Sequence, residues 1–98
     1  MSRVILSNWA LADLRDIGRH IAQHNPQASQ RWVRKLRETC KQTIGTFPEC
    51  GTRRDDLLAG MRSFSVGDYL IYFKSRDSVR ILRIVHGTQT QENLRFEP

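Results

Sequence analysis

The stretch Gly60–Gly87 constrains the fold of this chain most strongly, because its composition is typical of β-strands throughout. Two runs within it, Tyr69–Lys74 and Ser78–His86, are rich in β-branched and aromatic residues. A polar connection of hairpin length joins them, which predicts an antiparallel hairpin. The run Met61–Val66 comes before them and is separated from them by the turn dipeptide Gly67-Asp68. The stretch therefore predicts three successive antiparallel strands.

Apolar residues occupy both alternating sets of positions in the last two of these strands. Strict alternation groups Ile81 with Val85 on one face of the sheet. The set predicted for the other face is Leu70, Tyr72, Leu82 and Ile84. Helices that pack on one face would leave this second face uncovered. We expect it to be covered either by loops, the N-terminus or a second copy of the chain, or by a partner protein.

An amphipathic helix is predicted before this stretch. From Trp9 to Ile21, apolar residues recur at helical spacing while charged residues occupy the other sides. The pair Ser7-Asn8 supplies a side-chain acceptor for the start of the helix. The helix should end at His24-Asn25-Pro26, because the residue before a proline is disfavoured in the α region.

A second helix is predicted to begin at Asn25 and Pro26, a capping residue followed by a residue suited to the first turn. It should run to about Gly45, with an apolar stripe that continues to Phe47. Its outer side is basic, with Arg31, Arg34, Lys35, Arg37 and Lys41. Such a side is more often a solvated surface than a nucleic-acid site. The connection between the helices is short, so they should form an antiparallel hairpin.

The predicted fold class is α+β, with a helical hairpin packed on a small antiparallel sheet. A first strand at Arg3–Ser7 precedes the helices, which gives the order β-α-α-β-β-β. This strand can join the sheet at an edge or beside the last strand. The 98 residues predict a single domain over positions 1–98.

Composition restricts the classes of protein to which the chain can belong. We expect a cytoplasmic location, because neither a signal peptide nor a membrane span is evident. The net charge of +6 suits an acidic partner. Cys40 and Cys50 lack metal-site spacing, and we interpret them as reduced thiols. His20 and His24 are spaced like a metal pair but have no evident third ligand. We therefore expect neither a metal nor a cofactor.

Three residues on the predicted strands form the one candidate catalytic constellation. Arg62 and Arg83 could stabilise phosphate charge beside the imidazole of His86, as phosphodiester cleavage requires. Arg83 and His86 are three positions apart, however, which places them on opposite faces of a strand. The simpler interpretation is that His86 ends the strand and that the arginines lie along the sheet.

The segments RSFSVGDYLIYF (Arg62–Phe73) and VRILRIVHG (Val79–Gly87) resemble the ParE branch of the RelE/ParE toxin superfamily. The N-terminal half agrees, because ALADLRDIGRHIAQHNPQASQRWVRKL resembles the helical hairpin of the family and TFPECGTRRDDLLAGMRSF its link into the sheet. The resemblance implies the fold predicted above, a bacterial cytoplasmic toxin and a small ParD-like antitoxin. The two chains would form a hetero-oligomer, in which the antitoxin covers the open sheet face and the helical hairpin.

The superfamily contains two activities, and the residues favour one of them. RelE-like members are ribosome-dependent mRNA endonucleases with an Arg on the strand that here reads Tyr69-Leu70-Ile71-Tyr72, where Leu70 takes its place. No tyrosine follows Tyr72. The resemblance therefore implies inhibition of DNA gyrase by binding, without an enzymatic activity and without sequence-specific binding to nucleic acid. The alternatives are a ribosome-dependent RNase and a non-toxic module that only binds antitoxin. One departure from the family is Thr88-Gln89, where a basic and an acidic residue are common.

The C-terminal segment Thr88–Pro98 is the predicted contact with gyrase. Leu94 and Phe96 are its large apolar residues and alternate about Arg95. They could anchor on the partner while Arg95 pairs with an acidic site. The alternative is that Leu94 and Phe96 fold back to cover the sheet.

Overall fold

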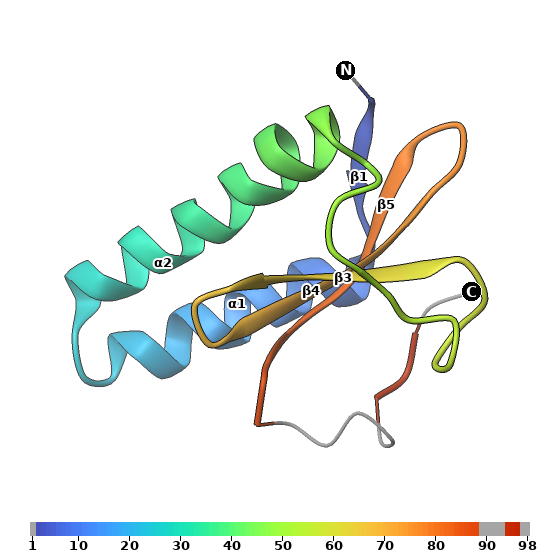
Figure 1. Cartoon of the computed structure of the whole chain (residues 1–98). Coiled ribbons are helices and arrows are strands. Elements are labelled where there is room, and N and C mark those ends of the chain that lie inside the picture. Colours follow the sequence, from blue (N-terminus) through green and yellow to red (C-terminus); the bar gives the residue numbers. More distant parts are fainter. Residues whose placement is uncertain (1, 89–93, 97–98) are drawn as a thin grey trace.

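The computed structural model describes residues 2–88 and 94–96 of the chain. Within them, two helices pack against a five-stranded sheet with the order β1-β5-β4-β3-β2 (Figure 1). The elements are β1 Val4–Leu6, α1 Asn8–Ala22, α2 Pro26–Glu38, the π-helix η1 Thr39–Ile44, β2 Thr52–Arg53, β3 Met61–Val66, β4 Tyr69–Ser75 and β5 Val79–His86. The predicted α+β fold and the order β-α-α-β-β-β are confirmed, and the short strand β2 is an addition.

The first strand makes the sheet mixed, where a small antiparallel sheet was predicted and the direction of the first strand was left open. β1 pairs parallel with β5, with Val4 opposite Val79 and Leu6 opposite Ile81. It thus lies both at an edge of the sheet and beside the last strand. The other pairs, β2 with β3, β3 with β4 and β4 with β5, are antiparallel. The run of apolar residues in β1 does not reveal its direction, which depends on how the helical hairpin returns the chain to the sheet.

Both predicted helix starts are confirmed by their side-chain caps. The Ser7 hydroxyl oxygen accepts a hydrogen bond from the Ala10 backbone N–H at 3.0 Å. The same hydroxyl donates to the Leu82 carbonyl of β5 at 2.9 Å, so this cap also fixes α1 to the sheet. At the start of α2, the Asn25 side-chain oxygen accepts from the Ala28 N–H at 3.0 Å, with Pro26 in the first turn.

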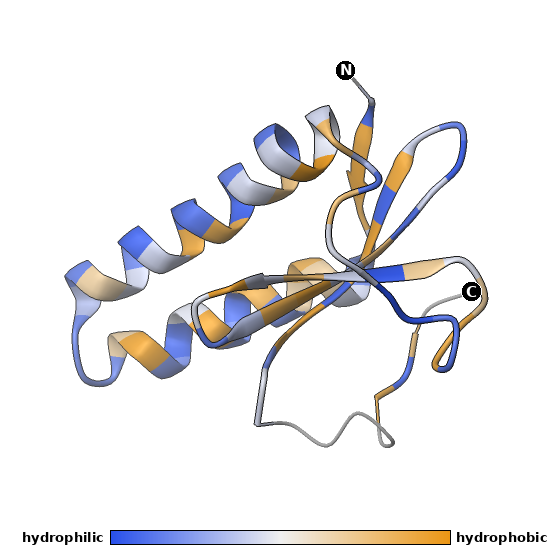
Figure 2. Ribbon diagram, viewed as in Figure 1, coloured by the Kyte–Doolittle hydropathy of each residue, from blue (hydrophilic) through white to orange (hydrophobic). Residues whose placement is uncertain are grey.

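The helical hairpin covers one face of the sheet and closes the main core. Ala10 and Leu14 of α1 and Leu36 of α2 are buried there. The strand residues in this core are Val66, Ile71, Phe73, Val79, Ile81 and Ile84. Figure 2 shows that the helices alternate between hydrophobic and hydrophilic residues, and that β5 carries short hydrophobic stretches separated by hydrophilic residues. Within the described part of the chain, no helix is both long and apolar enough to cross a membrane.

The π-helix η1 corrects the predicted stripe of the second helix. It continues α2 from Thr39 to Ile44, and the Gly45 N–H bonds to the Cys40 carbonyl five residues earlier. Cys40 and Ile44 are buried as expected. Phe47, however, is 65% exposed, so its predicted place on the buried stripe is wrong. The wider turn of a π-helix changes the direction in which later side chains point, and α-helical spacing does not account for that change.

Candidate functional site

The second face of the sheet carries a separate apolar cluster, which we call the second-face cluster. Its buried members are Met61, Tyr72, Leu82 and Val85, and its half-buried members are Leu57, Leu58, Leu70, Leu94 and Phe96. The link before β3 and the C-terminal segment thus supply part of its cover. Both faces of the sheet were expected to need cover, and at these positions the chain's own link and C-terminal segment cover the second face.

Ile84 does not belong to the second face, and this corrects the grouping predicted from alternation. It packs in the main core with Ile81, whereas Val85 joins Leu82 in the second-face cluster. The cause is an irregularity in the pairing of β4 with β5. Tyr72 lies opposite Arg83 but Phe73 lies opposite Ile81, which leaves Leu82 as the extra residue of a β-bulge. A bulge shifts the alternation by one residue and so exchanges the faces that follow.

The described residues of the C-terminal segment lie on the second face. Leu94 and Phe96 are half-buried in the cluster, and the Phe96 ring meets the Tyr72 ring edge to face at a centroid distance of 5.5 Å. The Arg95 side chain is exposed between them. Positions 89–93 and 97–98 of the predicted contact segment lie outside the described residues. The two apolar residues therefore fold back on the sheet, and Arg95 faces solvent.

Arg83 connects the first helix, the last strand and this segment. Its guanidinium donates to both carboxylate oxygens of Asp13 in α1, at 2.7 and 2.9 Å, and to the Arg95 carbonyl at 2.9 Å. It also lies over the Trp9 ring, 5.4 Å from the centroid. Hydrogen bonding to the Asp13 carboxylate raises the pKa of Arg83 above its ordinary value, so the group stays charged. The Asp13 carboxylate also accepts a hydrogen bond from the Ile84 N–H at 2.9 Å. It thus provides an acceptor for a backbone N–H of β5 that lies beyond the end of β1.

The Tyr72 hydroxyl is buried beneath the C-terminal segment. The side chain is fully buried, and burial raises the pKa of the phenol. The nearby Arg54 guanidinium acts in the opposite direction on that pKa. The Arg54 side chain is 20% exposed and is bound to the Asp56 carboxylate at 2.9 Å. The second-face cluster therefore has a polar group in its interior and a cation at its border.

The three candidate catalytic residues do not all converge. Arg62 lies opposite Phe73, a residue of the main core, whereas Arg83 lies opposite Tyr72 of the second face. Directly opposed residues share a face, so the two arginines are on different sides of the sheet. His86 lies opposite Tyr69, and their rings meet edge to face at 5.4 Å. Because Tyr69 packs against the main core, the same criterion places His86 on the face of Arg62 and Arg83 on the other face, so the predicted constellation is divided.

Arg83 and His86 do share one cleft, which we call the β5 cleft. It has a volume of about 500 Å³ and lies between α1 and the end of β5, with Asp16, His20 and Tyr69 also in its lining. His86 Nδ1 accepts from the Thr88 N–H at 3.2 Å and lies 2.7 Å from the Thr88 hydroxyl. Thr88, one of the two residues at which the chain departs from the family, thus orients the His86 ring. The other, Gln89, lies outside the described residues.

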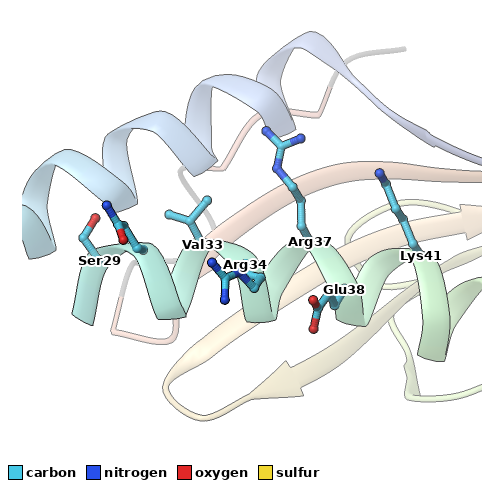
Figure 3. A pocket seen from close by; sticks show the side chains of 7 residues that line it. Ser29, Val33, Arg34, Arg37, Glu38 and Lys41 are labelled. Carbon is cyan, nitrogen blue, oxygen red and sulfur yellow. The ribbon is translucent and has the colours of Figure 1, made fainter. Parts of the chain in front are cut away.

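A basic groove runs along the second helix, and we call it the α2 groove. It has a volume of about 580 Å³ and is lined by Ser29, Gln30, Val33, Arg34, Arg37, Glu38 and Lys41. Figure 3 shows Val33, Arg37 and Lys41 extending from one side of the helix. Three cations and one carboxylate leave the groove positive. The three cations were predicted to lie on a solvated basic side of the helix, and all three are exposed.

A further hollow joins Trp9 to Arg95, and sequence reasoning did not find it. This Trp9 hollow has a volume of about 380 Å³ and is lined by Trp9, Ala12, Asp13, Asp16, Arg83 and Arg95. Trp9 is 36% exposed and lies outside the apolar stripe that was predicted from Ala10, Leu14, Ile17 and Ile21. Exposed Trp and Arg side chains are common anchors of protein interfaces. The available signal was a tryptophan beside the predicted apolar stripe and not in it.

Both cysteines are free thiols in different surroundings. Cys40 is buried in the main core, and this burial raises the pKa of its thiol to about 12. Cys50 is half-buried in the link, where burial also raises its pKa. Among the residues that the structure describes, no group of three or more His, Cys, Asp or Glu side chains could hold a metal ion.

Comparison with known proteins relates this geometry to one family. The family model described as the ParE toxin of the type II toxin–antitoxin system parDE matches residues 4–91. Toxin ParE3 of Caulobacter vibrioides is 29% identical over 89 residues, which cover 89% of this chain and 88% of that protein.

Two solved structures share the fold. The chromosomal ParDE toxin–antitoxin system from P. aeruginosa aligns with a TM-score of 0.74 at 21% identity, covering 88% of this chain and 96% of that one. The toxin–antitoxin complex RelBE2 from Mycobacterium tuberculosis aligns with a TM-score of 0.64 at 25% identity, covering 87% and 90%.

Proposed function

Because the chain belongs to the ParE toxin family of type II toxin–antitoxin systems, we propose that it binds and inhibits DNA gyrase and that a small ParD-like antitoxin neutralises it. The toxin class follows from the family, whereas the target and the antitoxin are our proposal. The cytoplasm, where gyrase acts on the chromosome, is the location that this proposal requires. Inhibition by binding requires an accessible contact surface on the toxin, and it does not require a catalytic site for hydrolysis.

The observation that carries the gyrase proposal is the position of Arg95. Its neighbours Leu94 and Phe96 are anchored on the second-face cluster, and its backbone carbonyl is held by Arg83 at 2.9 Å. The exposed guanidinium is therefore presented from a fixed backbone beside the half-exposed Trp9 ring. A cation on a backbone that is already fixed requires less ordering on binding than one on a free segment, and its charge favours an acidic protein surface as the partner.

Burial decides which of the predicted partner-binding residues can touch a partner directly. Leu70, Leu94, Arg95 and Phe96 keep accessible surface. Tyr72 and Leu82 are at most 2% exposed and support the contact surface from below, whereas Ile84 is buried in the main core on the other face of the sheet. We assign the direct contact with gyrase to the accessible group, together with Trp9.

The antitoxin is assigned to the α2 groove on the basis of charge. Arg34, Arg37 and Lys41 flank the apolar Val33 there, which suits an acidic segment with apolar side chains. Such a segment is typically disordered when free and orders on binding. Binding to the folded toxin raises its apparent stability by mass action, by about 2.7 kcal/mol at a ligand concentration of 100 times Kd.

Two measurements test these assignments. In a supercoiling assay, the wild-type protein should inhibit gyrase, and Arg95→Glu should inhibit it at least about tenfold more weakly. In a thermal-unfolding assay, saturating antitoxin should raise the melting temperature of the wild type and much less that of Arg34→Glu/Arg37→Glu. The pair Arg15→Glu/Arg19→Glu, exposed on α1, carries the same change of charge and serves as the control. Wild-type protein without effect on supercoiling would refute the gyrase proposal.

A ribosome-dependent RNase is the second candidate function. The β5 cleft favours it, because Arg83 and His86 both line this cleft with Tyr69 and His20. Arg83 is already bound to the Asp13 carboxylate, which reduces its capacity to stabilise a phosphate. Arg62 does not line the cleft. Inhibition of gyrase by binding therefore remains the function that the arrangement supports best.

A further inference from the structure

A fourth hollow lies at the end of the β4–β5 hairpin, and we call it the hairpin hollow. It has a volume of about 350 Å³ and combines Leu58 and Leu82 with Lys74, Arg76 and Arg80. Leu82 is buried and Leu58 half-buried, whereas Arg76 and Arg80 are exposed. The two leucines therefore form an apolar floor, and the cations surround it.

The charge of this hollow is not balanced locally. Its lining contains three cations and a single carboxylate, that of Asp77. In the described part of the chain, none of the three cations takes part in an ion pair, since those ion pairs involve Arg53, Arg54 and Arg83. Exposed cations close together repel one another at low salt, and an anionic occupant would relieve that repulsion.

The hairpin hollow is continuous with the apolar surface on which the C-terminal segment packs. Leu58 and Leu82 belong to the same second-face cluster as Leu94 and Phe96. The segment and the hollow thus share one apolar surface, of which the segment covers one part and the hollow remains open. A partner that binds Arg95 and the accessible edges of Leu94 and Phe96 could therefore extend its contact onto the open part of this surface.

We propose that the hairpin hollow binds an acidic segment of gyrase that inserts one apolar side chain against Leu58 and Leu82. Carboxylates on either side of that side chain would pair with Arg76 and Arg80. This inference rests on the proposed function and adds to it a second contact, separate from Arg95. None of the lining residues is aromatic, so the hollow lacks a platform for base stacking, which favours a peptide over single-stranded nucleic acid.

The test uses the double variant Arg76→Glu/Arg80→Glu, whose exposed positions allow normal folding. Its affinity for gyrase should fall by at least about tenfold, mainly through slower association, because rim charges act on the encounter rate. The affinity of the wild type should decrease with added salt, and that dependence should be weaker in the variant. The control pair Arg15→Glu/Arg19→Glu should retain wild-type affinity, and both variants should bind antitoxin as the wild type does.

The outcomes separate this inference from the proposed function. If the wild type binds gyrase and the double variant binds equally well, the inference is wrong and the proposed function stands. If the wild type does not bind gyrase at all, the proposed function fails and the inference fails with it. If the wild type binds a single-stranded oligonucleotide without gyrase and the double variant loses that binding, the occupant is nucleic acid and the inference is again overturned.

Discussion

The guanidinium of Arg83 and the carboxylate of Asp13 form a two-pronged ion pair, at 2.7 and 2.9 Å, between residues 70 positions apart in the sequence. Both side chains are largely buried, with 16% and 13% of their surface exposed. The pair fixes α1 against β5, and through the Arg95 carbonyl it also holds the C-terminal segment. Helix packing and presentation of the proposed gyrase contact therefore depend on the same interaction.

Asp13→Ala should lower the free energy of unfolding by about 2 kcal/mol, because Arg83 and the Ile84 N–H lose a charged acceptor. Urea denaturation followed by circular dichroism measures this. Asp16→Ala removes an exposed acid from the same helix and should change stability by less than about 0.5 kcal/mol. In a double-mutant cycle with Arg83→Met, a coupling energy near zero would contradict the role of the pair.

Phe96→Ala should destabilise the protein by about 1 to 2 kcal/mol, since the half-buried ring packs edge to face on Tyr72. The midpoint of urea unfolding should fall with an unchanged slope. Arg95→Ala, at the exposed position between the two anchors, should leave the midpoint as it is. Equal midpoints for the wild type and Phe96→Ala would mean that the segment does not pack on the sheet in solution.

Gly67→Ala should cost more stability than Gly60→Ala. Both glycines have positive φ, at 58° and 78°, so both substitutions strain the backbone. A Cβ at Gly67 would lie 2.6 Å from the Trp32 ring, whereas one at Gly60 would meet the flexible end of Lys74 at 3.5 Å. We expect the difference to be at least about 1 kcal/mol, together with a change in Trp fluorescence for Gly67→Ala only. Equal costs would argue against close packing of the β3–β4 turn on α2.

Stability should decline in alkaline solution partly through Cys40. Because burial raises the pKa of this thiol to about 12, the unfolded chain loses the proton near pH 9 while the folded chain keeps it. The stability present below pH 9 is therefore lost as the pH rises towards 12, with a slope of up to about 1.4 kcal/mol per pH unit. Cys40→Ala should show a shallower decline between pH 9 and 11 in urea titrations. Parallel profiles for the two proteins would refute this.

Neither Arg62→Ala nor His86→Ala should change the pattern of mRNA in a translating-ribosome assay, because we expect no cleavage by the wild type. Arg62 and Arg83 lie on different faces of the sheet, so the constellation for phosphodiester cleavage is not assembled. Circular dichroism of both variants controls for folding. Cleavage by the wild type that either substitution abolishes would establish the RNase function instead.

The helices and their caps followed from the sequence, because the signals that specify them are local. Helical spacing in α1, the hydroxyl of Ser7 and the side chain of Asn25 each act within one turn of the chain. The strands of the β3–β4–β5 meander were likewise evident from composition and turn residues, with ends within one or two residues of the prediction. The resemblance to one toxin family depended on these same segments.

The tertiary structure alone decided where several of these residues point. The bulge at Leu82 reverses the face of Ile84, because one extra residue shifts a two-residue period. Likewise, the π-helix turns Phe47 outward, and the pairing with β5 makes β1 parallel. Arg83 meets Asp13, and Phe96 meets Tyr72, only after distant segments have packed together. Periodicity reports local conformation, whereas these arrangements arise from contacts between segments whose separation in sequence leaves no local pattern.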